Sequence, residues 1–124
     1  MNVLVGFISI QHFAFLYLEM FLWNTPVGMR VFKLAPDFAA ESAALAANQG
    51  LYNGFLAAGL LWSLLTKNSV FATKLKIFFL SCVLIAGLYG GYSVSSTILW
   101  VQAIPAALVL VCVLFFRKHL THQS

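Results

Sequence analysis

Four long apolar segments, separated by short polar stretches, decide what this chain can fold into. A transmembrane helix needs about 20 mostly apolar residues, because the hydrocarbon core is about 30 Å thick and each residue rises about 1.5 Å. The segments that meet or nearly meet this length are residues 3–23, 49–65, 77–92 and 96–116. They are apolar on nearly every face, and in lipid only a helix then pairs each backbone N–H and C=O within its own segment. The sequence predicts an all-α, polytopic integral membrane protein built as a four-helix bundle.

Composition excludes the other classes of protein. Of the 124 residues, 62% are hydrophobic and 8% are charged, whereas a soluble domain carries roughly 25% charged residues. The length leaves no room for a large enzyme or for a receptor with a folded ectodomain. We therefore expect residues 1–124 to form a single membrane domain.

The first connection, from residue 24 to residue 48, is too long to be a plain turn. Within it, Pro36 and Asp37 are typical of the first turn of a helix, because proline lacks only an N–H that is unpaired there and a carboxylate complements the helix dipole. The alanine-rich stretch that follows favours a helix. We expect an extra interfacial helix over residues 36–47, or an extension of the second span outside the bilayer.

The basic residues predict the orientation of the chain. Two lie in the first connection, namely Arg30 and Lys33. Five lie by the second connection or in the C-terminal tail, namely Lys67, Lys74, Lys76, Arg117 and Lys118. The positive-inside rule then places both termini of this multi-pass membrane protein in the cytoplasm. The net charge of +4 suits anionic headgroups of the lipid bilayer, and no basic face with interleaved aromatic residues indicates a nucleic acid partner.

Two ionisable residues within the first span are the candidate catalytic residues, Glu19 and His12. An ionisable side chain inside the membrane costs about 2.5–3.5 kcal/mol, so it is first suspected of a function. The two residues are seven apart and share a helix face, but about 10.5 Å along the axis separates them, which excludes direct contact. The structural alternative is that Glu19 is tied to Asn53, a tyrosine or a backbone group, and that Gln102 or a tyrosine satisfies His12.

Polar residues from the other three segments are expected in the same half of the bundle as Glu19. These candidate ligand-binding residues are Asn48, directly before the second segment, Gln49, Tyr52 and Asn53 within it, Tyr89 from the third segment and Gln102 from the fourth. Their alternative role is capping and hydrogen bonding between helices.

The sequence gives little support for redox, metal or cofactor chemistry. Cys82 and Cys112 form no Cys-x-x-Cys pair, and buried apolar thiols explain them. The sequence contains no cluster of histidines and carboxylates that would predict a metal site, and no motif that indicates a cofactor or a catalytic reaction. Whether the protein is an enzyme, and whether a second copy of the chain is its partner, stays open.

The chain resembles a family of small bacterial membrane proteins. The runs that carry the resemblance are LEMFLW at 18–23, AANQGLYNGFLAAGL at 46–60, AGLYG at 86–90 and QAIPA at 102–106, with Val31 and Phe32 between the first two. They are similar to the family known as domain of unknown function 1304, over nearly the whole chain. The resemblance implies a four-helix inner-membrane protein of about this length and no established reaction.

Three functions fit these residues. The first is binding, or conversion, of a lipid-like or small amphipathic molecule in an outer-leaflet polar pocket around Glu19. The second is proton-coupled transport of a small molecule, since small multidrug transporters have a similar size and one glutamate in their first helix. Their first connection is shorter, however, and they lack the 48–54 run. The third is a structural or partner-binding subunit.

Overall fold

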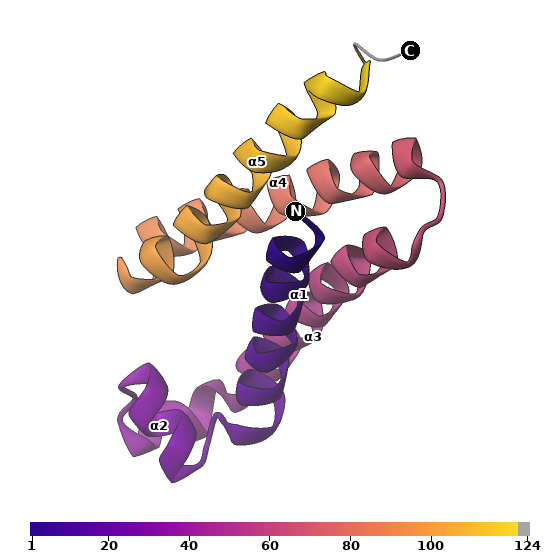
Figure 1. Ribbon diagram of the computed structural model, residues 1–124. Coiled ribbons are helices and arrows are strands. Elements are labelled where there is room, and N and C mark those ends of the chain that lie inside the picture. The colour runs from indigo at the N-terminus through magenta and orange to yellow at the C-terminus, as the bar shows by residue number, and fades with distance from the viewer. Residues whose placement is uncertain (122–124) are drawn as a thin grey trace. The chain divides into compact units, whose positions relative to one another are not determined.

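The computed structural model describes residues 1–121, and every regular element in that range is a helix. The elements in chain order are α1 (Asn2–Tyr17), the π-helix η1 (Leu18–Leu22), α2 (Pro26–Phe32), α3 (Pro36–Leu65), α4 (Ser69–Ser93), the π-helix η2 (Leu99–Ala103) and α5 (Ile104–Thr121) (Figure 1). The all-α prediction is therefore confirmed.

Three helical stretches of the described chain are long and apolar enough to cross a membrane. They are Asn2–Leu22, Ser69–Ser93 and Leu99–Arg117, and they coincide with the first, third and fourth expected spans. The second of them begins earlier than expected, because the side chain of Asn68 accepts a hydrogen bond from the backbone N–H of Phe71 and caps α4 ahead of its lysines. This result is consistent with a membrane protein.

Residues 36–47 and 49–65 form the single helix α3, so residues 36–47 continue the second segment, which is one of the two arrangements expected for them. The polar side chains of Asn48, Gln49 and Asn53 lower the mean hydropathy of residues 48–65, and α3 is not among the three apolar stretches of the described chain. Alanine, leucine and glutamine favour the helix around residue 48 and outweigh the lower helix propensity of Asn48 and Gly50, so α3 continues through this point.

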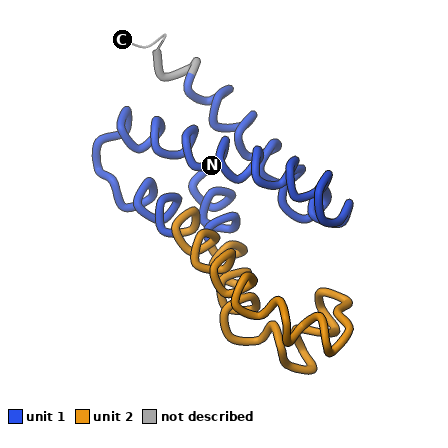
Figure 2. Tube along the Cα trace, turned by 180° about the vertical axis from the view of Figure 1, so that it is seen from behind, with its two compact units in different colours: residues 1–9, 58–124 blue, residues 10–57 orange. Residues whose placement is uncertain are grey.

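The helices group into two compact units, which we describe one at a time (Figure 2). Unit 1 consists of residues 1–9 and the chain from residue 58 onward, and unit 2 consists of residues 10–57. Both α1 and α3 contribute one end to each unit.

Unit 1 is organised by α4 and α5, which run antiparallel side by side (Figure 1). A Cβ atom on Gly87 would lie 2.7 Å from the backbone nitrogen of Ala103, so the two backbones pack closely at this point. The π-helix η2 lies directly before Pro105, and its closing hydrogen bond runs from the N–H of Ile104 to the carbonyl of Leu99. Proline has no N–H with which to continue an α-helical ladder, and the wider turn accommodates it.

Unit 2 folds back on itself after η1. The side chain of Thr25 accepts a hydrogen bond from the N–H of Gly28 at 3.3 Å and caps α2, with Pro26 in the first helical position. The indole Nε1 of Trp23 donates to Ser42 Oγ at 2.9 Å, which joins the end of η1 to the start of α3. The short α2 therefore depends on contacts with its neighbours, because seven residues are too few for a stable isolated helix.

We predict that Lys33→Gly stabilises unit 2. Lys33 ends α2 in the left-handed conformation, with φ 55° and ψ 49°, and its backbone N–H donates to the carbonyl of Met29. A side chain in this conformation costs about 1–2 kcal/mol, which glycine avoids. The greater freedom of glycine in the unfolded chain offsets part of the gain, so we expect a net increase of about 0.5 kcal/mol. Thermal unfolding in detergent measures it.

Arg30→Gly is the matched control for this substitution. It removes the same charge, but from a right-handed position within α2, where glycine costs about 1 kcal/mol relative to alanine. Equal destabilisation by both substitutions would contradict the assigned role of the Lys33 backbone.

Candidate functional site

Unit 2 contains a buried carboxyl group. Glu19 belongs to η1, and only 5% of its surface is exposed. The side-chain Nδ2 of Asn53 on α3 donates a hydrogen bond to Glu19 Oε1 at 3.1 Å, and Asn53 is itself 9% exposed. The second carboxyl oxygen, Oε2, is buried and forms no hydrogen bond within the described chain. The site therefore offers one unused hydrogen-bonding position on an acid.

Two glycines of α3 allow this pair to form. A Cβ atom on Gly50 would lie 3.0 Å from Glu19 Cβ and 3.1 Å from the carbonyl oxygen of Leu16, and a Cβ atom on Gly54 would overlap the Leu16 side chain. Small residues let helix backbones approach closely. Gly50 and Gly54 thus bring Asn53 within reach of the acid.

His12 is also buried in unit 2, and its ring makes an edge contact with Phe15 at a centroid distance of 5.2 Å. It lies two helical turns before Glu19 along α1 and η1. Joint action of His12 and Glu19 in a reaction stays a prediction.

The other expected residues of α3 lie on the surface. Asn48, Gln49 and Tyr52 are exposed, and Tyr52 packs its ring near Phe55 at 5.9 Å. Among the four candidate ligand-binding residues of this helix, Asn53 is the one that hydrogen-bonds to Glu19.

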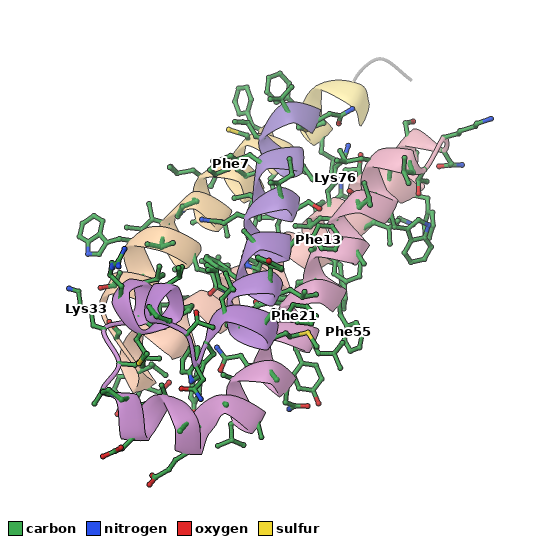
Figure 3. All side chains as sticks on the ribbon, turned by 90° about the horizontal axis from the view of Figure 1, so that it is seen from below. Phe7, Phe13, Phe21, Lys33, Phe55 and Lys76 are labelled. Atoms are coloured by element: carbon green, nitrogen blue, oxygen red, sulfur yellow. The ribbon has the colours of Figure 1, made fainter. Side chains whose placement is uncertain are left out.

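Exposed aromatic side chains are frequent in unit 2. Phe13, Phe21 and Phe55 are all exposed and belong to α1, η1 and α3 respectively (Figure 3). Tyr17 and Phe21 also pair their rings at 5.8 Å. An apolar surface of this kind suits contact with hydrocarbon chains.

Tyr89 and Gln102 belong to unit 1. Tyr89 lies on α4 and is 70% exposed. Gln102 lies in η2, and its Nε2 donates to the backbone carbonyl of Val83 on α4 at 3.4 Å. Gln102 thus contributes to the α4–α5 pairing.

Lys76, which the sequence placed by the second connection, lies inside a helix. It lies within α4, is 5% exposed, and its Nζ donates to Asn2 Oδ1 at 2.7 Å (Figure 3). Lys74 is exposed as expected. Helix periodicity offered a signal, because Lys76 lies four residues after buried Ala72 and four before buried Leu80, on the core-facing side of the helix.

The comparisons with known proteins cover most of the chain. Residues 6–114 match the model of the family described as "Protein of unknown function (DUF1304)". The chain belongs to this family. It is similar to the "Uncharacterized protein YpaA" of Lactococcus lactis subsp. lactis (strain IL1403), with 26% identity over 110 residues that cover 87% of this chain and 91% of the relative. No solved structure matches.

The family description names no function, so the chemistry of the site is argued from its residues. Among the described residues, no group of three or more histidine, cysteine, aspartate or glutamate side chains is placed to hold a metal ion. In the buried Glu19–Asn53 pair of unit 2, the carboxyl oxygen Oε2 of Glu19 remains available for a further hydrogen bond.

Proposed function

We propose that this chain is a multi-pass inner-membrane protein, with four spans and cytoplasmic termini, that binds a lipid-like or small amphipathic molecule at Glu19 and Asn53. The observation that carries the proposal is the buried Oε2 of Glu19, which has no hydrogen-bond donor in the described chain. A buried polar atom without a partner is costly, and a donor on a bound molecule removes that cost.

The surroundings of the pair favour an amphipathic molecule. Asn53 already supplies a donor to Oε1, so the ligand has to supply an N–H or O–H group for Oε2. The exposed phenylalanine side chains of the same unit, Phe13, Phe21 and Phe55, suit an attached hydrocarbon chain. The polar end of the ligand would contact the acid, and its apolar end would lie against this aromatic surface.

Native mass spectrometry of the purified protein tests the proposal. We expect the wild-type chain to carry a stoichiometric small molecule and Glu19→Gln to lose at least about tenfold in its occupancy, because a hydrogen bond to a charged group contributes about 1.5–3 kcal/mol. Glu41→Gln is the matched control, since Glu41 is an exposed acid of α3 in the same unit. A wild-type protein without ligand, or equal occupancy in both variants, would contradict the proposal.

Proton-coupled transport is the second candidate, and the same unbonded oxygen favours it, because a carboxyl group with a free oxygen is able to carry a proton. In this case ligand binding releases a proton from Glu19. Measuring the pH change of a weakly buffered solution on ligand addition distinguishes the two functions: release that disappears in Glu19→Gln supports transport, and binding without release supports the first function.

A further inference from the structure

We propose that Lys76 and Asn2 form an anion-binding site in unit 1 that takes a phosphate group, separate from the Glu19–Asn53 pair. Lys76 is buried within a membrane-spanning helix, and the one hydrogen bond that it makes in the described chain goes to the neutral amide oxygen of Asn2 at 2.7 Å. An ammonium group has three donors, so two remain for a ligand.

No carboxylate side chain of unit 1 is available to neutralise this charge. The three acidic residues of the chain, Glu19, Asp37 and Glu41, all lie in unit 2. Unit 1 contains Lys67, Lys74, Lys76 and two further basic residues of the tail. A buried ion without a partner of opposite charge is strongly destabilising, and a bound anion would supply the counter-charge that the side chains of unit 1 lack.

Asn2 marks the point where an anion reaches the lysine. The stem of Lys76 is buried, but its Nζ ends at Asn2, which is exposed. Long basic side chains commonly bury their methylene groups and hold the charged end at a surface. Lys76 lies seven residues after the start of α4 at Ser69, which is about 10.5 Å along the helix and within the depth from which such a side chain reaches an interface.

The start of α1 adds a second contribution at the same point. Asn2 begins this helix, and the first N–H groups of a helix have no acceptor within it. The dipole also places partial positive charge there, which favours an anion. The ammonium, the amide and the helix start therefore converge on one position.

The apolar surface near this position favours a phosphate carried by a lipid. Val3 and Leu4 follow Asn2 along α1, and both are exposed. Acyl chains have an apolar surface to lie on beside the basic group. Free inorganic phosphate offers the same charged group without these contacts.

Binding of phospholipids to the delipidated full-length protein in detergent tests the site. We expect phosphatidylglycerol to bind at least about tenfold more tightly than phosphatidylcholine of the same chain length. Lys76→Met removes the preference, Asn2→Ala reduces it, and Lys74→Met keeps most of it. Lys74 is the matched control because it is an exposed lysine two residues away on the same helix.

Two arms identify the source of the phosphate, and one measurement guards against misfolding. Competition by millimolar inorganic phosphate supports a site for the phosphate group alone, and failure to compete supports a site for the intact lipid. Lys76→Met should unfold at the same or a higher temperature than the wild type without lipid, because an apolar side chain replaces a buried charge. Equal binding of both lipids by the wild type, or equal losses in Lys74→Met and Lys76→Met, would overturn the proposal.

Discussion

Asn53→Ala is expected to destabilise the protein by about 2–3 kcal/mol, because it removes the side chain that donates to Glu19 Oε1 at 3.1 Å. Oε2 is already without a donor in the described chain, so the substitution leaves a buried carboxyl group with no side-chain partner. Stranding a buried polar group costs about 1–3 kcal/mol, and more when it is charged. Reversible unfolding in mixed micelles, followed by tryptophan fluorescence, measures the change.

A double-mutant cycle separates this cost from the loss of packing. Glu19→Leu removes the acid, and Asn53→Ala in that background no longer leaves a stranded carboxyl group. We expect Asn53→Ala to cost at least about 1 kcal/mol less in the Glu19→Leu chain than in the wild type, since contacting residues show coupling of about 0.5–3 kcal/mol. Additive effects would mean that the 3.1 Å contact contributes nothing to stability.

The cycle also tells a ligand site from a structural hydrogen bond. If the pair only joins η1 to α3, the chain without both polar groups loses the packing of the Asn53 side chain and no bound molecule. If the pair binds a molecule, Glu19→Leu/Asn53→Ala folds but purifies without it. Stability and ligand occupancy therefore respond differently to the same two substitutions.

The helices were predictable from the sequence because long apolar segments leave the backbone no other way to pair its polar groups in lipid. Their boundaries were less predictable. Lys74 and Lys76 suggested an end to the third span, yet α4 begins at Ser69, because the Asn68 cap fixes the start of the helix and hydropathy does not. Similarly, α3 continues without a break past residue 48, where the second segment was expected to begin.

The candidate site was predictable in part. The sequence left three kinds of partner open for Glu19, and the structure shows a hydrogen bond with Asn53. The four-residue spacing of Gly50 and Gly54 was visible, but the choice of Asn53 depends on how closely α3 approaches η1. The π-helices carry Glu19 and Gln102. Pro105 accounts for the wider turn of η2, but no local pattern in the sequence specifies the i→i+5 register of η1.

Gly28→Ala is expected to displace α2 from the end of η1. A Cβ atom at this position would overlap the carbonyl oxygen of Leu22 and approach that of Trp23 at 2.5 Å. These are backbone atoms and do not move aside as a flexible side chain does. We therefore expect the free energy of unfolding to fall by about 3 kcal/mol, at the upper end of the usual cost of overpacking. The loss should be local, because α2 has seven residues and rests on η1.

Trp23 reports this displacement directly. Its ring packs against Phe32 of α2 at a centroid distance of 4.7 Å, and its Nε1 donates to Ser42. In Gly28→Ala we expect a red-shifted Trp23 emission, measured with Trp62 and Trp100 replaced by phenylalanine, and faster amide exchange over residues 26–32. Gly6→Ala is the control, since its Cβ would meet Leu64 at 3.7 Å, an ordinary contact, and alanine favours the helix by about 1 kcal/mol. If amide exchange over residues 26–32 is unchanged in Gly28→Ala, the close backbone approach at Gly28 does not hold α2 in place. The Thr25 cap and the Trp23 contacts would then suffice.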